Sequence, residues 1–191
     1  GALRSYLLAR GELPRKSMVC GAPVSLRTNS DKGSGNKLAT MQVGLATDVE
    51  DPVARLRAVH QYAVHGKKKI SALGSGTIMD ISDSLAPVAL AEGLRALNFA
   101  STRLADMPVP FHVMISNVPG PQQQMSIAEY SLQSLMGLGP VRHSMGLFHI
   151  VIQTATEQSI SFASCYGMMP DPEAYEECLE KSVKELVNAC S

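Results

Sequence analysis

The chain has 191 residues, 45% of them hydrophobic, so it is long enough to bury a core as one domain or one large lobe. Its 17 basic and 17 acidic side chains cancel, which argues against nucleic-acid binding because no overall field attracts a polyanion. No apolar stretch approaches the ~20 residues that a membrane-spanning helix needs, so any contact with lipid is expected to be peripheral.

The first elements are a short helix and a pair of strands. Leu3, Tyr6 and Leu7 share one helical face, and Gly11 is expected to end the helix. Residues 18–26 and 38–45 then follow a strand pattern on either side of a polar, glycine-rich loop. We expect a long hairpin or two neighbouring strands.

A helix start is marked by Asp51-Pro52, because the carboxylate can cap free amides and proline suits the first helical position. An apolar stripe continues to Gly66, and Lys67-Lys68-Lys69 is interpreted as the solvated helix end. Residues 78–104 predict one or two buried helices around Pro87. These helices either border an alkyl-chain channel or cover the sheet.

A third strand is predicted over residues 111–118 by the alternation of apolar and polar side chains. It runs into the string Ser116-Asn117-Val118-Pro119-Gly120-Pro121, whose prolines remove two backbone donors. We expect Gly120 to take the positive φ of a type II turn.

The C-terminal third predicts a weak strand at 130–135, strands at 147–156 and 160–166, and a helix that starts at Asp171-Pro172. The outward face of that helix carries Glu173, Glu176, Glu177, Glu180 and Lys184. Strands separated by amphipathic helices imply a layered α/β domain with a mixed or antiparallel sheet.

Cysteine and methionine usage points to a reduced, metal-free interior. The cysteines form no CxxC pair and no Cys/His zinc spacing, and nothing resembles a signal peptide, which favours the cytoplasm. We interpret Cys165 and Cys178 as buried apolar residues. The ten methionines either fill the core or line an adaptable lipid tunnel.

Several stretches, in order, resemble the C-terminal domain of bacterial wax ester synthase/acyl-CoA:diacylglycerol acyltransferases. They are Gly1 to Pro14, Ala22-Pro23-Val24-Ser25-Leu26-Arg27, Gly35-Asn36, Leu45-Ala46-Thr47-Asp48, Asp51 to Leu56, and Ile115 to Pro121. The resemblance implies the second lobe of a chloramphenicol-acetyltransferase-like fold, with the active site in a channel between two lobes.

The resemblance also implies that residues 1–191 are the C-terminal domain of a longer protein. The family's catalytic signature HHxxxDG belongs to an N-terminal domain, and no adjacent histidines occur here, so we place no catalytic residue in this chain. Gly1 begins within a helical pattern without a capping side chain, which fits a fragment. The expected partners are that N-terminal domain, acyl-CoA and a lipid alcohol, with a homodimer left open and no cofactor.

Five residues are candidates for the substrate channel: Ser116, Asn117, Pro119, Gly120 and His149. Ser116 and Asn117 end a rigid strand, so they either face the channel or bond to the turn's own backbone. His149 stands where the family has asparagine, in Gly146-Leu147-Phe148-His149-Ile150. A lone histidine without an orienting carboxylate is usually structural.

Two functions follow from these observations. The chain is one lobe of an enzyme that moves a fatty acyl group from acyl-CoA to a long-chain alcohol or diacylglycerol, at a cytoplasmic location that includes the surface of a membrane or lipid droplet. Alternatively it is a non-catalytic lipid-binding or scaffolding module on the same fold. The departures from the family after Pro121, among them Gln122-Gln123-Gln124, favour the second function.

Overall fold

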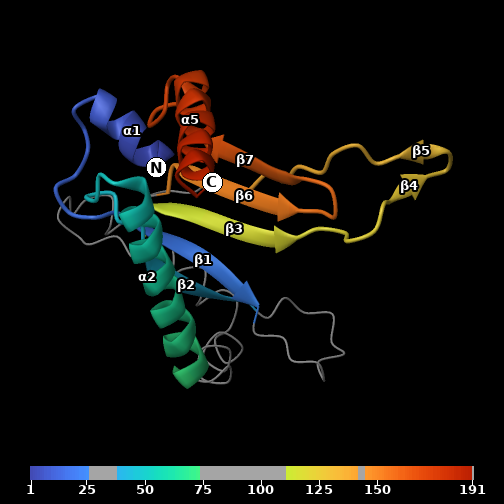
Figure 1. The fold of residues 1–191 in the computed structure, drawn as a ribbon, viewed down its shortest axis with the longest axis horizontal. Coiled ribbons are helices and arrows are strands. Elements are labelled where there is room, and N and C mark those ends of the chain that lie inside the picture. Colours follow the sequence, from blue (N-terminus) through green and yellow to red (C-terminus); the bar gives the residue numbers. More distant parts are fainter. Residues whose placement is uncertain (26–37, 74–110, 142–144, 191) are drawn as a thin grey trace, which may run out of the picture.

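The computed structural model describes residues 1–25, 38–73, 111–141 and 145–190. Within these ranges a five-stranded mixed sheet has the order β2-β1-β3-β6-β7 (Figure 1). Its strands are β1 (Val19–Ser25), β2 (Leu38–Gly44), β3 (Val113–Pro119), β6 (Leu147–Gln153) and β7 (Gln158–Ser164). The three central strands are parallel, and each edge strand is antiparallel to its neighbour. The mixed α/β fold class predicted from the sequence is confirmed.

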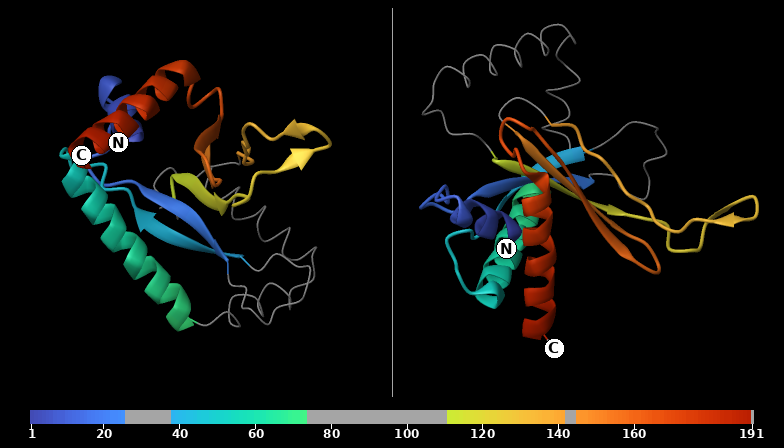
Figure 2. Two further views of the ribbon diagram at one scale, coloured as in Figure 1. Left: turned by 45° about the vertical axis from the view of Figure 1, so that its right-hand side comes forward. Right: turned by 90° about the horizontal axis from the view of Figure 1, so that it is seen from above.

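Three helices, α1 (Ala2–Ala9), α2 (Pro52–Leu73) and α5 (Pro172–Cys190), lie on the same side of this sheet (Figure 2). The core lies between these helices and the sheet. Its buried members are Ala2, Tyr6, Cys20, Met41, Val43, Val113, Leu147, Met169 and Tyr175. Among the described residues no helix combines the length and the apolar character needed to cross a bilayer.

The predicted hairpin of the first two strands is confirmed, and its alternation explains which face it buries. Ala39, Met41 and Val43 are buried, whereas the residues between them are exposed. Side chains on a strand alternate between faces, so every second residue of β2 meets the core. In β1, Cys20 lies opposite Val43.

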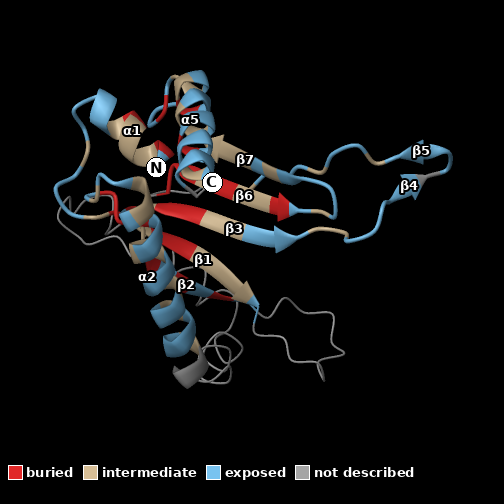
Figure 3. Ribbon diagram, in the orientation of Figure 1, coloured by how far each residue is buried: buried red, intermediate tan, exposed pale blue. Residues whose placement is uncertain are grey.

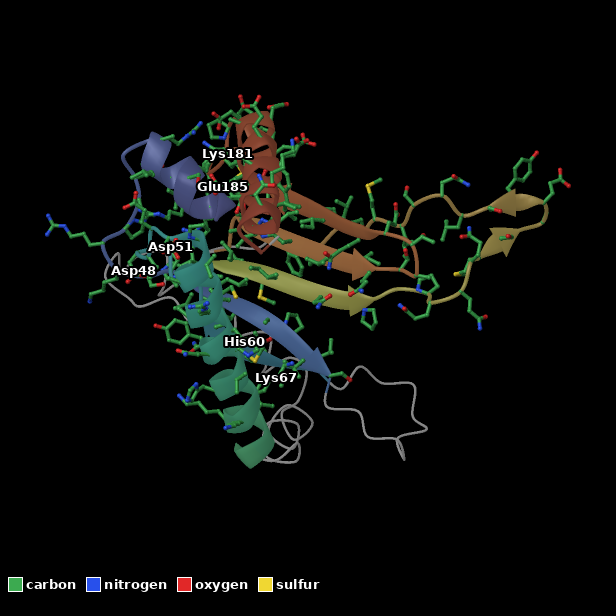
Figure 4. The ribbon with its side chains drawn as sticks, viewed as in Figure 1. Asp48, Asp51, His60, Lys67, Lys181 and Glu185 are labelled. Carbon is green, nitrogen blue, oxygen red and sulfur yellow. The ribbon has the colours of Figure 1, made fainter. Side chains whose placement is uncertain are left out.

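Helix α2 begins where expected, because the Asp51 carboxylate accepts a hydrogen bond from the amide of Ala54 at 2.7 Å. The predicted end at Gly66 is wrong, since the helix continues to Leu73. Gly66 serves packing instead: a side chain there would meet the Met41 sulfur at 2.9 Å. The lysines at 67–69 therefore lie within the helix, beyond His60 (Figure 4).

The short helix α1 ends as the sequence predicts. Gly11 has a φ of +70°, and the amides of Gly11 and Glu12 donate to the carbonyls of Leu8 and Leu7 at 3.0 and 2.9 Å. These two hydrogen bonds satisfy the last carbonyl groups of the helix. The turn that forms them favours glycine, which has no Cβ to oppose a positive φ.

The last helix also begins at the predicted position, and its five outward residues are all exposed. The Asp171 carboxylate, however, accepts hydrogen bonds from side chains of α1 and the residue after it, whereas that of Asp51 accepts one from a backbone amide of its own helix. The donors to Asp171 are the Tyr6 hydroxyl, at 2.6 Å, and the Arg10 guanidinium. Asp171 therefore ties the start of α5 to α1.

The string at the end of β3 differs from expectation in one respect. Among the described glycines only Gly11 has a positive φ, so the type II turn assigned to Gly120 is wrong. The Gly120 amide donates to the carbonyl of Gln153 at 2.9 Å, and a Cβ at Gly120 would lie 2.9 Å from Ile152. Gly120 is needed for close approach to the end of β6.

Between β3 and β6 the chain forms a small second sheet of β4 (Ser126–Ile127) and β5 (Tyr130–Ser131), which projects from the body of the molecule (Figure 1). The strand predicted at 130–135 is thus only two residues long. Strands β6 and β7 lie within their predicted ranges, to within two residues.

The expectation of two buried cysteines is wrong for Cys165, which is exposed, whereas Cys178 is half-buried and Cys20 is buried. The predicted helices at 78–104 lie outside the described residues, as does His143. The same holds for the glycine-rich loop at 28–36.

Candidate substrate-facing cavity

A cavity of about 300 Å³ lies between the sheet and the three helices. Its floor comes from β3, β6 and β7, and its walls come from the inward faces of α1, α2 and α5. The apolar lining includes Leu3, Leu45, Leu56, Val59, Val113, Ile115, Val151, Ile160, Leu179, Val183 and Leu186. The arrangement follows from strand alternation, because Val113 and Ile115 of β3 point to the same face as His149 and Val151 of β6.

His149 is the one candidate from the sequence that lines this cavity. The side chain is 6% exposed, and its Nε2 lies 2.8 Å from the hydroxyl of Tyr175 on α5. Its Nδ1 is buried and has no hydrogen-bond partner among the described residues. Burial lowers the pKa of His149 to about 4, against a smaller opposing effect of the Met114 backbone.

The ring of Tyr175 is the centre of an aromatic cluster beside the cavity. It contacts Tyr6 and Phe162 edge to face, at centroid distances of 5.4 and 5.1 Å, and His149 at 5.7 Å. Burial raises the pKa of the Tyr175 hydroxyl. At neutral pH both members of the His149–Tyr175 pair are therefore uncharged, as an apolar environment requires.

Two other polar side chains at the cavity, those of Arg55 and Thr47, are engaged by the backbone. Arg55 donates from one nitrogen to the carbonyls of Val49 and Glu50, at 2.9 and 3.0 Å. Thr47 accepts a hydrogen bond from the amide of Met18 at 2.9 Å. Both side chains hold the segment that connects β2 to α2 in place, and neither supplies a reactive group.

The geometry supports binding of apolar groups rather than catalysis. A general base works best with a pKa near the operating pH, and His149 is far below it. Within the described ranges no three His, Cys, Asp or Glu side chains gather as metal ligands.

The other four candidates are not part of the cavity lining; they lie between the middle of β3 and the residue after its end. Ser116 is half-buried and pairs with Ile150 in the sheet, whereas Asn117 and Pro119 are exposed. Neither the Ser116 hydroxyl nor the Asn117 amide group bonds to a described residue, so the expected alternative of bonds to the turn's backbone is not seen there. The structure does not bring these residues together with His149.

The remaining described histidines are structural or solvated. His112 accepts a hydrogen bond through Nδ1 from the amide of Val19 at 3.1 Å, which joins β1 to the start of β3. His60 and His65 are exposed on α2. No sequence pattern indicated that Arg55 and Thr47 line the same cavity as His149.

Fold and cavity define an apolar α/β lobe, and comparison with known proteins identifies its class. Residues 34–187 match the family described as "WS/DGAT C-terminal domain". The chain belongs to this family of wax ester synthases and diacylglycerol acyltransferases.

Two individual relatives support the same family assignment. The chain is 32% identical over 171 residues to Rv3480c of Mycobacterium tuberculosis, provisionally named a diacylglycerol O-acyltransferase, covering 89% of this chain and 34% of the relative. It is 30% identical over 191 residues to tgs2 of the same species, provisionally given the same activity, covering 99% of this chain and 40% of the relative. The chain thus spans only about a third to two fifths of these relatives.

A solved structure confirms the fold. All of this chain superposes on 41% of the wax ester synthase/diacylglycerol acyltransferase from Marinobacter aquaeolei VT8, with a TM-score of 0.69 and 23% sequence identity. The expected lobe of a chloramphenicol-acetyltransferase-like fold is therefore correct.

Proposed function

We propose that residues 1–191 form the C-terminal lobe of an O-acyltransferase that moves a fatty acyl group from acyl-CoA to a long-chain alcohol or diacylglycerol. Membership of the WS/DGAT C-terminal domain family carries this proposal. The relatives named above are more than twice as long as this chain, which leaves room for an N-terminal catalytic domain. No cofactor is required, since acyl-CoA is itself the activated donor.

In this proposal the reacting groups belong to the N-terminal domain, where the family carries HHxxxDG. The base takes the proton of the acceptor hydroxyl, and the alkoxide then attacks the thioester carbonyl and expels the CoA thiolate. The chain described here supplies a rigid wall. Its parallel strands β3 and β6, joined over six residue pairs, hold that wall in one position.

We do not assign an alkyl chain to the 300 Å³ cavity. Gly1 is part of its lining, and a Cβ added at Gly1 would overlap the Ser182 side chain. A residue joined to Gly1 in a longer polypeptide would adjoin the same space. We instead place the substrate channel between the two lobes, beside the second half of β3, where no described residue bonds to the Ser116 hydroxyl or to the Asn117 amide group.

The test uses the polypeptide encoded by the complete reading frame, assayed with radiolabelled palmitoyl-CoA and with hexadecanol or dipalmitoylglycerol as acceptor. Labelled wax ester or triacylglycerol is expected, and its absence with every acceptor would contradict the enzyme. Asn117→Ala should lower turnover while leaving the melting temperature within about 2 °C, because the side chain is exposed. Gln61→Ala, at an exposed position of α2, serves as the control and should leave turnover unchanged.

A non-catalytic lipid-binding or scaffolding module is the second candidate. The observation that favours it is the run Gln122-Gln123-Gln124, with His149 in the place of asparagine. Binding of palmitoyl-CoA or diacylglycerol without turnover, together with a degraded HHxxxDG upstream, would select this function. A cytoplasmic location with peripheral contact to a membrane or lipid droplet fits both candidates, and a homodimer remains to be measured by light scattering.

A further inference from the structure

Residues 122–141, which we call the arm, leave β3 and return toward β6. The β4–β5 hairpin in this segment extends beyond the ends of the main sheet in each view (Figures 1 and 2). The hairpin has two residue pairs, Ser126 with Ser131 and Ile127 with Tyr130. An isolated two-stranded hairpin is marginally stable at best in water. Packing against another surface would therefore stabilise this hairpin.

The arm exposes large apolar side chains to a degree unusual for a soluble surface. Tyr130 is 74% exposed, Met136 72% and Leu138 80%, and Met125 and Val141 are also exposed. The burial colouring shows the hairpin residues whose burial is described as exposed (Figure 3). Single exposed apolar residues are ordinary, but several on one segment mark an interaction surface.

The base of the arm is fixed to the sheet by hydrogen bonds, so the backbone that carries Met136 and Leu138 is held in position. The Ser159 hydroxyl donates to the carbonyl of Leu135 at 2.6 Å, and the Ser161 hydroxyl donates to that of Gly137. Gly139 lies so close to Phe148 that a side chain there would overlap the ring. A surface held in its bound conformation loses less entropy on association.

The number of charged residues in the arm distinguishes a protein surface from a lipid surface as its binding partner. Of the twenty residues in the arm only Glu129 is charged, and there is no lysine or arginine. Segments that adsorb to anionic lipid carry basic residues, each worth about 1 kcal/mol near the surface. The arm lacks this attraction, whereas a near absence of charge together with exposed Met and Tyr side chains is typical of the core of a protein interface.

We propose that the arm docks on the other domain of the same polypeptide, with Met136 and Leu138 inserted into an apolar surface of that domain. The relatives extend well beyond the part that this chain spans, so a large protein surface is available in cis. This inference rests on the proposed function only for the existence of that domain.

Hydrogen–deuterium exchange on the complete polypeptide and on residues 1–191 tests the proposal. Amides of the arm are expected to exchange at least tenfold more slowly in the complete polypeptide. The double variant Met136→Ser/Leu138→Ser should remove this difference. Leu8→Ser, which changes a leucine that is 56% exposed on α1, should leave it intact. Far-UV circular dichroism verifies folding, and Tyr130→Ser provides a second arm variant.

Other results would overturn the docking. Equal exchange in the two proteins excludes an intramolecular contact, as does a reading frame that encodes no further domain. Protection of 1–191 that grows with its concentration indicates a second copy, and protection by neutral phosphatidylcholine vesicles indicates a lipid surface. The acyl-transfer assay is read separately on the same samples: protection without ester formation keeps the docking and contradicts the enzyme, and the reverse contradicts the docking alone.

Discussion

His149 shows how burial converts a titratable residue into a structural one. The imidazole is almost fully enclosed, its Nε2 meets the Tyr175 hydroxyl, and its pKa falls to about 4. The sequence predicted that this residue lies in a strand, which is confirmed. It could not reveal Tyr175 as the partner, because the two residues meet only through the packing of α5 on the sheet.

The low pKa of His149 predicts a stability that depends on pH. In the unfolded chain the residue takes up a proton near pH 6.5, whereas in the folded state it does so only near pH 4. Its contribution is therefore complete above pH 6.5 and is lost as the pH falls to about 4, by on the order of 3 kcal/mol.

Urea unfolding at pH 7.5, 5.5 and 4.5 measures this loss, and His149→Gln should flatten the profile. His60→Gln on the exposed face of α2 is the control and should keep the wild-type slope. If the wild type and His149→Gln show the same slope between pH 6.5 and 4, the histidine does not govern it.

Removing the Tyr175 hydroxyl predicts a second effect at this pair. Tyr175→Phe keeps the ring and its edge-to-face contacts but leaves the His149 Nε2 without its partner. An unsatisfied buried polar group costs about 1–3 kcal/mol, so urea unfolding should show a loss of this size. Tyr166→Phe, at an exposed position, should change the free energy of unfolding by less than about 0.5 kcal/mol.

At the scale of elements, local patterns located most strands and helices within two or three residues. Alternation located β1, β2 and β3, and the Asp-Pro pairs located both long helices. Gly66 misled because a glycine in a helical pattern suggests an end, whereas here it allows α2 to approach Met41. Gly120 led to the wrong prediction of a type II turn in a similar way. A side chain is excluded there by the end of β6, which is distant in sequence.

Gly120 gives the element-scale prediction. A methyl group at this position would lie 2.9 Å from the Ile152 side chain and 3.0 Å from the Gln153 carbonyl, and the backbone cannot easily give way. Gly120→Ala should lower the free energy of unfolding by about 1–2 kcal/mol through overpacking.

Gly167→Ala is the matched control, because nothing lies within 4 Å of the added atom and its φ is ordinary. That variant should be neutral or slightly stabilising, as expected when glycine entropy is removed at a compatible site. A Gly120→Ala protein as stable as the Gly167→Ala protein in thermal melts would show that the end of β6 tolerates the methyl group.

For the whole molecule, net charge and the arm together predict solution behaviour. Basic and acidic side chains are equal in number, and the isoelectric point is near 7.1. Proteins without net charge associate most readily, and the exposed side chains of the arm add an apolar surface. Solubility of residues 1–191 should therefore be lowest near pH 7.

Turbidity against pH measures this minimum, and Met136→Ser/Leu138→Ser should make it shallower without moving its position. A minimum that shifts away from pH 7 in the variant, or one unchanged in depth, would show that the arm does not drive the association.

The order of the strands could not be predicted from local patterns, because the centre of the sheet is assembled from distant parts of the chain. Cys20 pairs with Val113, and Ile115 with His149. The cavity depends on the same long-range assembly, since its floor and walls come from every described part of the chain. Resemblance to a known family indicated the kind of fold but not this order of strands.

That sheet order also bears on how the polypeptide matures during translation. The β1–β2 hairpin can close while synthesis continues, but its parallel neighbour emerges from the ribosome only about ninety residues after β1. Synthesis at about 5–20 residues per second leaves this half-finished edge uncovered for several seconds. A nascent chain with such an edge is a natural client for chaperones, and expression at lower temperature together with chaperone overproduction should raise its soluble yield.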